Sequence, residues 1–172
     1  MRLLGFEHGS FAVELRDAEP KRSGLDDVEF GFAPNMGEPM RPLRAIASSG
    51  EISRVMLATK AVLAAHDRIP VMVFDEIDAN VGGEMGTAVG RKLAEVAQRH
   101  QVICITHLPQ VAVFGQTHLA VSKSVRDGRT VTEVRTLEAK DRVDEVARML
   151  GGRDLTSVTV KHARELLEGV RA

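Results

Sequence analysis

The most constraining feature of the sequence is an apolar run that ends in carboxylates. Residues 71–74 read Val-Met-Val-Phe, and Asp75, Glu76 and Asp78 follow at once. A short uninterrupted apolar run is typical of a strand buried on both faces of a parallel sheet, and the carboxyl end of such a strand opens onto the crevice where α/β proteins bind ligands. Adjacent carboxylates there suit a magnesium ion beside a phosphate and a base for water. The alternative is an ordinary strand end followed by a polar turn.

Composition narrows the class of protein. A chain of 172 residues with 44% hydrophobic and 27% charged residues is long enough for one well-buried globular domain. A net charge of −1 argues against strong sequence-independent binding of nucleic acid, and the absence of Tyr and Trp argues against base-stacking platforms. The single Cys104 excludes an internal disulfide and is typical of a buried, inert thiol. The apolar runs are too short to span a membrane. The apolar start at residues 1–5 is too short for a secretion signal and is soon followed by Glu7 and His8, so we expect a cytoplasmic protein.

Hydrophobic periodicity predicts an α/β fold with a largely parallel core sheet, flanking helices, antiparallel strands and a β-hairpin. Alternating residues predict an antiparallel β layer in the first 45 residues. Apolar strands at 71–74 and 102–106 are separated by a helical pattern, which predicts a parallel β-α-β unit. The hairpin is centred on Asp127 and Gly128, because Asp-Gly is a strong turn signal. The predicted helices cover residues 48–66, 84–99, 141–150 and 156–170. The first helix is expected to bury Ile52, Val55, Met56, Thr59, Val62 and Leu63.

Two further motifs lie on either side of the acidic strand. Small residues at 48–50 precede Glu51 at the predicted start of a helix, where exposed backbone N–H groups and the helix dipole favour phosphate. An ordinary helix cap is the alternative, because Ser is among the best capping residues. His107 follows the next apolar strand. If the two strands are neighbours, Glu76 and His107 face one crevice; otherwise His107 is a polar strand terminus.

Together these motifs resemble the second half of an ABC-type ATPase head. Residues 46–57 (Ile-Ala-Ser-Ser-Gly-Glu-Ile-Ser-Arg-Val-Met-Leu) and 104–111 (Cys-Ile-Thr-His-Leu-Pro-Gln-Val) resemble more closely the RecN family, bacterial double-strand-break repair relatives of the structural maintenance of chromosomes (SMC) proteins. The resemblance runs from about residue 6 to 168 and includes Gly-Leu-Asp-Asp-Val-Glu-Phe at 24–30 and Val-Ala-Arg-Met-Leu-Gly-Gly at 146–152. It implies a P-loop NTPase-like ABC/SMC head, of which this chain is the carboxyl-terminal half.

The resemblance also implies roles for individual residues. Asp75 would help to hold Mg²⁺, and Glu76 would be the general base for the attacking water. Asp78 would belong to the loop that crosses the dimer interface, and His107 would be the switch histidine at the γ-phosphate of ATP. A signature that closes over ATP held by the opposite subunit would consist of Ser48, Ser49, Gly50 and Glu51. Phosphoryl transfer depends mainly on such positioning and on charge stabilisation.

The sequence departs from the family pattern in two places. The family usually has two glycines after the first serine of the signature, whereas Ser49 replaces the first of them here. The phosphate-cradling loop needs Gly-Lys followed by Ser or Thr, and none of the 15 glycines is followed by Lys. In the family this loop lies in an amino-terminal segment, beyond a long antiparallel coiled coil. The chain is therefore interpreted as one half of a split head that is inactive alone.

The resemblance then implies an organisation and a set of partners. A β-rich entry segment (1–45) leads to the core with the signature, acidic strand and switch (46–118), and a hairpin with closing helices (119–172) ends the chain. The partners would be the amino-terminal half of the head, a second head bound through ATP, and DNA, with no membrane. The expected function is ATP hydrolysis in DNA double-strand-break repair in the bacterial cytoplasm, at the nucleoid.

Two other functions fit parts of the sequence. The acidic strand also matches a DExD-type helicase, but that reading leaves the small-residue signature and His107 unexplained. A non-catalytic dimerisation or DNA-bridging scaffold is the second alternative, and the near-neutral net charge is mildly against it.

Overall fold

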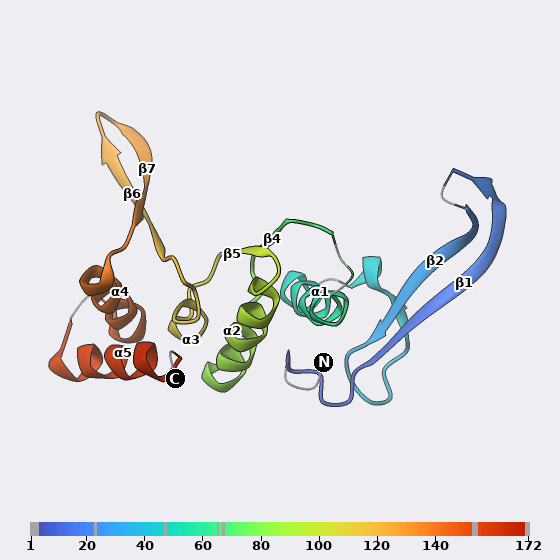
Figure 1. Ribbon diagram of the computed structural model, residues 1–172, viewed down its shortest axis with the longest axis horizontal. Helices are drawn as coiled ribbons and strands as arrows, with labels where there is room; N and C mark the ends of the chain where they lie inside the picture. The colour runs from blue at the N-terminus through green and yellow to red at the C-terminus, as the bar shows by residue number, and fades with distance from the viewer. Residues whose placement is uncertain are drawn as a thin grey trace.

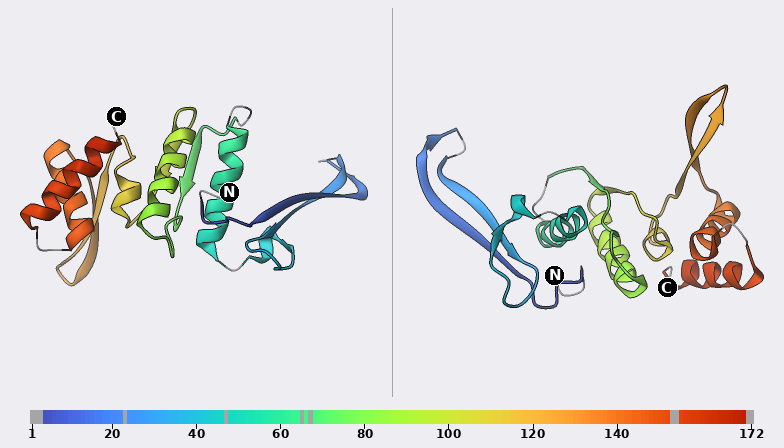
Figure 2. Two further views of the ribbon diagram at one scale, coloured as in Figure 1. Left: turned by 90° about the horizontal axis from the view of Figure 1, so that it is seen from below. Right: turned by 180° about the vertical axis from the view of Figure 1, so that it is seen from behind.

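The computed structural model describes residues 4–22, 24–46, 48–64, 66, 68–152 and 155–170. The chain is elongated, with a long antiparallel arm at one end, helices packed on one side of a parallel strand pair in the middle, and a hairpin with two helices at the other end (Figures 1 and 2). In chain order the elements are β1 (Ser10–Lys21), β2 (Gly24–Ala33), β3 (Arg41–Pro42), a 3₁₀ turn (Leu43–Ala45), α1 (Ser49–Leu63), β4 (Val71–Phe74), α2 (Gly83–Ala97), β5 (Gln101–Cys104), α3 (Pro109–Ala112), β6 (Leu119–Arg126), β7 (Arg129–Thr136), α4 (Ala139–Gly151) and α5 (Ser157–Gly169).

The amino-terminal strands form the predicted antiparallel layer. β1 pairs with β2, and β2 pairs with β3. Because side chains alternate across a strand, one face of the β1–β2 arm is apolar and the other is polar. Its apolar face is solvent exposed along the outer part of the arm, at Val13 (54%), Leu15 (68%), Val28 (55%) and Phe30 (44%). The outer part of this apolar face has no cover among the described residues, whereas Phe32 at its inner end is fully buried in the main core.

The two central strands pair in parallel, as predicted. Phe74 of β4 lies opposite Cys104 of β5, and α2 connects the strands. Met72 and Phe74 are buried, whereas Val71 and Val73 are 42% and 62% exposed. The expectation that β4 is buried on both faces is therefore wrong for one face, because the described helices cover only the other. The buried side belongs to the main hydrophobic core, with Leu4, Phe6, Phe32, Val55, Leu57, Met72, Phe74, Ile77, Val89, Leu93, Val96 and Val111.

Helix α1 forms where the sequence predicts it, but its buried face differs. Val55 and Leu57 are fully buried, whereas Met56, Val62 and Leu63 are 39%, 80% and 46% exposed. The helix therefore turns a second apolar stripe to solvent. At its amino end the Ser48 hydroxyl accepts a hydrogen bond from the backbone N–H of Glu51 at 3.4 Å, which is the ordinary helix cap that the sequence left open as the alternative.

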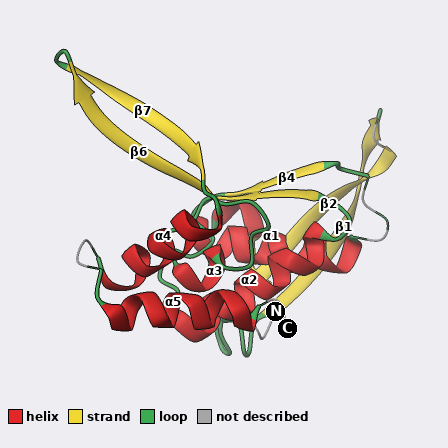
Figure 3. Cartoon of the chain, turned by 60° about the vertical axis from the view of Figure 1, so that its left-hand side comes forward, coloured by secondary structure: helices red, strands yellow, loops and turns green. Residues whose placement is uncertain are grey.

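The carboxyl-terminal part matches the prediction closely. β6 and β7 form an antiparallel hairpin that projects away from the helices (Figure 3). Asp127 and Gly128 both have positive φ, at 51° and 73°, as the tight hairpin turn requires. α4 and α5 pack together around a second core that contains Val113, Val146, Ala147, Ala163 and Leu167. Within the described ranges, no helix has the length and apolar character to cross a membrane.

Close packing between α2 and α3 makes one glycine hard to replace. A Cβ at Gly90 would collide with the ring of Phe114 and lie 3.1 Å from the carbonyl O of Gln110. We expect Gly90→Ala to lower the free energy of unfolding by about 1–3 kcal/mol because of overpacking, although alanine favours a helix by about 1 kcal/mol. Urea unfolding measures this. The matched control is Gly169→Ala in α5, where a Cβ meets nothing within 4 Å; equal midpoints for both variants would contradict the prediction.

Candidate functional site

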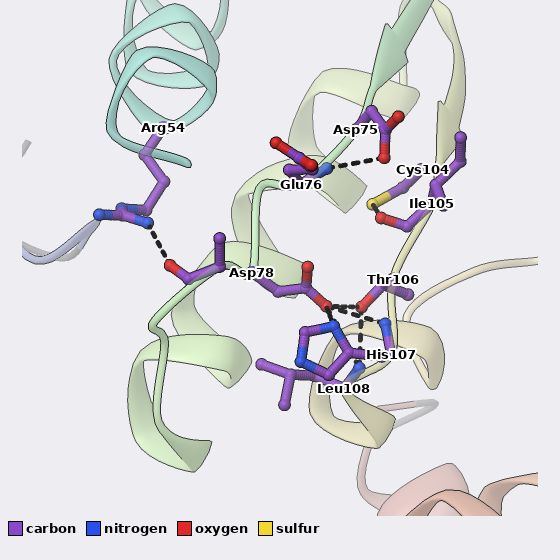
Figure 4. A network of polar contacts seen from close by, with 10 residues as sticks. Arg54, Asp75, Glu76, Asp78, Cys104, Ile105, Thr106, His107 and Leu108 are labelled. Carbon is purple, nitrogen blue, oxygen red and sulfur yellow. Dashed lines mark hydrogen bonds and ion pairs between the residues drawn. The ribbon is translucent and has the colours of Figure 1, made fainter. Parts of the chain in front are cut away.

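The ends of β4 and β5 bring the acidic segment and the histidine segment to one edge of the parallel sheet. The strands run in register, and the pairing extends past β5, where Ile105 N donates to Phe74 O at 2.9 Å. Residues 75–78 and 105–108 therefore leave the sheet side by side (Figure 4). The prediction that Glu76 and His107 face one crevice required the two strands to be neighbours, and the parallel pairing meets that condition.

The segment after β4 turns sharply. Glu76 and Asn80 both have a left-handed backbone, with φ of 55° and 59°, which is uncommon for residues other than glycine. Asp75 Oδ1 accepts the N–H of Glu76 at 2.9 Å, and Ala79 N donates to Glu76 O at 3.0 Å. Both Asp75 and Glu76 are exposed. The turn thus directs two adjacent carboxylates away from the core.

The third carboxylate of the segment points the other way. The side chain of Asp78 is only 3% exposed, and its Oδ2 lies 3.1 Å from Nδ1 of His107, whose side chain is 74% exposed. Asp78 therefore contacts its own chain's histidine segment. The sequence expectation for Asp78, a loop that crosses a dimer interface, concerns a second subunit and stays untested.

The amino end of α1 packs on the same acidic turn. Ser53 Oγ donates to the carbonyl O of Asp75 at 3.0 Å, and Arg54 donates to the carbonyl O of Ala79 at 3.2 Å. A Cβ at Gly50 would lie 3.0 Å from Cβ of Ala79 and 3.2 Å from each of the carbonyl oxygens of Ala79 and Glu76. The signature-like segment and the acidic turn therefore form one packed unit. Ser49, in contrast, is exposed.

Two residues of this neighbourhood had no role in the sequence prediction. The guanidinium of Arg54 lies 5.4 Å from the ring centroid of Phe6, and burial lowers its pKa. It remains protonated at neutral pH, as arginine does in proteins. The second residue is Thr106, whose hydroxyl donates a hydrogen bond to Oδ2 of Asp78. The only sequence signal for Arg54 was a charged residue inside an otherwise apolar helical pattern.

Cys104 lies at the same edge of the sheet, but its thiol is unreactive. Burial raises the pKa of its thiol to about 12, and the negative charges of Asp78 and Asp75 act in the same direction. Since the thiolate is the reactive form, the predicted inert thiol agrees with this environment. Among the described residues, no cluster of three or more His, Cys, Asp or Glu side chains could hold a metal by itself.

Several curated proteins are similar to this chain. DNA repair protein RecN of Halalkalibacterium halodurans is 44% identical over 173 residues, which cover 98% of this chain and 31% of the relative. RecN of Deinococcus radiodurans is 45% identical (98% and 30%), and RecN of Mycobacterium leprae is 49% identical (94% and 28%). The chain thus spans less than a third of the length of these relatives. No family model matches it.

Solved structures agree in fold. The Smc head domain of Pyrococcus yayanosii, with a coiled coil and joint, aligns with a TM-score of 0.59 at 23% identity, over 99% of this chain and 27% of that chain. A structure described by ATP-driven dimerization and DNA-stimulated activation of SMC ATPases aligns at a TM-score of 0.51 and 22% identity, over 89% and 88% of the two chains. The predicted relationship is confirmed: the sequence corresponds to the carboxyl-terminal part of RecN-family proteins, with the fold of an SMC head.

Proposed function

We propose that this chain supplies the water-activating carboxylate, the switch histidine and the signature segment of an ATP-hydrolysing head that acts in DNA double-strand-break repair. The observation that carries the proposal is the convergence of the acidic turn, His107 and the amino end of α1 at one edge of the parallel sheet. The similarity to proteins named for DNA repair and to SMC ATPases supports the wider process.

The two exposed carboxylates, Asp75 and Glu76, have different roles in hydrolysis. Glu76 acts as the general base that takes a proton from the attacking water. Asp75 would help to hold Mg²⁺, which is commonly bound by one or two carboxylates together with phosphate oxygens and water. An exposed aspartate at a strand end fits that donor set. When bound, Mg²⁺ would supply charge stabilisation to the phosphates.

The remaining residues orient the nucleotide. His107 contacts the γ-phosphate from the end of the neighbouring strand. The signature residues act on ATP held by the opposite head, where the amino end of α1 presents the exposed Ser49 and the favourable end of the helix dipole. These signature residues are Ser48, Ser49, Gly50 and Glu51. The loop that grips the β- and γ-phosphates comes from another segment, because the chain contains no Gly-Lys pair.

Two uncovered apolar faces support a partner segment that carries this loop. One is the face of the parallel pair with Val71, Val73, Ile103 and Ile105, which are 42–62% exposed. The other is the outer apolar face of the β1–β2 arm. Exposed apolar patches and strand edges favour association, so we expect the amino-terminal half of the head to cover them. Cytoplasmic location and contact with DNA belong to the assembled protein.

The proposal is tested by assembly. Alone, the chain is expected to show no useful ATP turnover; co-expressed with a RecN amino-terminal segment that bears the phosphate loop, it is expected to bind ATP and to hydrolyse it with Mg²⁺. Activity per head should rise with head concentration, because each site needs the signature of a second head. Sizing and an ATPase titration measure this, and a Lys→Ala change in the supplied phosphate loop is the control.

Distinct outcomes would contradict distinct parts of the proposal. Robust Mg²⁺-dependent hydrolysis by the 172-residue chain alone, abolished by Glu76→Gln, would overturn the split-head interpretation. Activity that is strictly linear in head concentration would remove the two-head requirement. DNA binding without any effect of nucleotide would favour the scaffold alternative.

A further inference from the structure

Asp78 is the one carboxylate of the acidic segment that is buried, and its side-chain oxygen Oδ2 contacts the segment after β5. Its Oδ2 accepts hydrogen bonds from Thr106 Oγ1 at 2.5 Å, from His107 N at 2.9 Å and from Leu108 N at 3.2 Å (Figure 4). Thr106 Oγ1 also accepts the N–H of Leu108 at 3.0 Å. One carboxylate oxygen therefore accepts hydrogen bonds from three successive residues, from the hydroxyl of Thr106 and from the backbone N–H groups of His107 and Leu108.

The same oxygen also reaches the imidazole ring. Nδ1 of His107 lies 3.1 Å from Oδ2 of Asp78, and a carboxylate at this distance favours the proton on Nδ1 over Nε2. A carboxylate that receives a histidine N–H fixes both the tautomer and the orientation of the ring. The remaining nitrogen, Nε2, belongs to a side chain that is 74% exposed, so it is the nitrogen left to meet a ligand.

We infer that Asp78 is a positioning residue, which holds His107 so that Nε2 faces the phosphate of the nucleotide. This inference rests on the proposed role of His107. It assigns Asp78 an action within its own head, in addition to any contact of the neighbouring loop with a second head. The backbone contacts set where the histidine leaves the strand, and the ring contact sets which nitrogen is presented.

The arrangement also links the base to the histidine. Glu76 and Asp78 lie two residues apart on the turn held by the left-handed residues Glu76 and Asn80. Asp78 connects this turn to His107 through charge-assisted hydrogen bonds, which are roughly twice as strong as neutral ones. A displacement of the turn therefore moves the base and the switch histidine together.

The first test uses this chain and needs no nucleotide. In Asp78→Ala the His107 amide loses its acceptor and the Leu108 amide keeps only Thr106 Oγ1, so the amide proton of His107 should exchange at least about 10-fold faster, that of Leu108 should exchange faster by less, and the ring should lose its fixed tautomer. Asp78→Asn retains an acceptor oxygen and should give an intermediate result. Amide exchange and ¹⁵N spectra of the imidazole measure both effects. Asp26→Ala, which removes an exposed carboxylate from β2, is the matched control.

Folding problems do not prevent this test. If circular dichroism shows that Asp78→Ala is unfolded, Asp78→Asn takes its place, because its single remaining acceptor oxygen cannot keep all of the contacts of the carboxylate, and the exchange of the His107 and Leu108 amides should still rise. Unchanged exchange at residues 107 and 108 in a folded variant would overturn the inference.

The second test uses the assembled head. Asp78→Ala should lower kcat about 10- to 100-fold, the range expected when an orienting partner is removed, with the KM for ATP changed less than about twofold. Combined with His107→Ala, it should lower kcat no further, because the two residues act through one contact. Losses that multiply would show that Asp78 acts independently of His107. An inactive wild-type head would contradict the proposed function instead, and the exchange result alone would then decide whether Asp78 holds the histidine.

Discussion

Glu76→Gln is expected to slow ATP hydrolysis by the assembled head by about 10²–10⁴-fold, the range typical of a positioned general base. Glutamine retains the shape of the side chain but cannot take a proton from water. Both residues carry a Cβ, so the left-handed backbone at this position, with φ of 55°, is equally demanding in the two proteins. ATP binding should therefore remain near the wild-type value.

Single-turnover hydrolysis and equilibrium ATP binding separate the two effects. Glu7→Gln, an identical change at an exposed position outside the site, is the control and should leave both quantities unchanged. Asp75→Asn should behave differently and weaken Mg²⁺-dependent binding as well, since it removes a hard anionic oxygen from the surroundings of the metal. If Glu76→Gln reduced binding and turnover equally, Glu76 would be structural rather than catalytic.

Sequence patterns predicted the local elements well where local chemistry decides them. The β6–β7 hairpin follows from Asp127 and Gly128, because a tight turn with two positive φ angles selects such residues. The parallel pairing of β4 with β5 follows from two short apolar runs separated by a helix. The buried residues Val89, Leu93 and Val96 of α2 recur at intervals of three and four residues, the spacing of one helix face.

The patterns failed at apolar faces that the described residues leave exposed. Met56, Val62 and Val73 lie on apolar faces, and each is more than a third exposed. Periodicity shows which side chains need cover, but it does not show which segment provides that cover. The same failure at two separate elements, α1 and β4, is what a partner segment over both faces would produce.

The direction of Asp78 was hidden for a different reason. A spacing of three residues places Asp75 and Asp78 on one motif, but the left-handed turn at Glu76 reverses the chain between them. Backbone dihedrals of this kind carry no signal when the residue is glutamate rather than glycine. Thr106 was missed because a hydroxyl at a strand end is common. Only its hydrogen bond to Asp78 in the structure shows that it belongs to the site.

Gly50→Ala is the second change for which we expect a large effect. The added Cβ would lie 3.0 Å from Cβ of Ala79 and 3.2 Å from two backbone carbonyl oxygens, of Ala79 and Glu76. None of these atoms is the end of a flexible side chain, so either the amino end of α1 or the acidic turn must move. Overpacking of this kind costs about 1–3 kcal/mol of stability. In the assembled head, turnover should also fall by about 10- to 100-fold, because a misplacement near 1 Å can cost that much.

Thermal unfolding of this chain measures the first effect, and ATPase activity of the assembled head measures the second. Gly169→Ala serves again as the control, since a Cβ there has open space. The exposed neighbour Ser49 gives an informative contrast, because Ser49→Gly changes no buried contact and should leave the packing of α1 on the turn intact. The glycine that the fold requires is thus Gly50, and a serine fits at position 49 within one head. A Gly50→Ala head with unchanged stability and turnover would show that the turn can recede, and that the signature and the catalytic base are not mechanically joined.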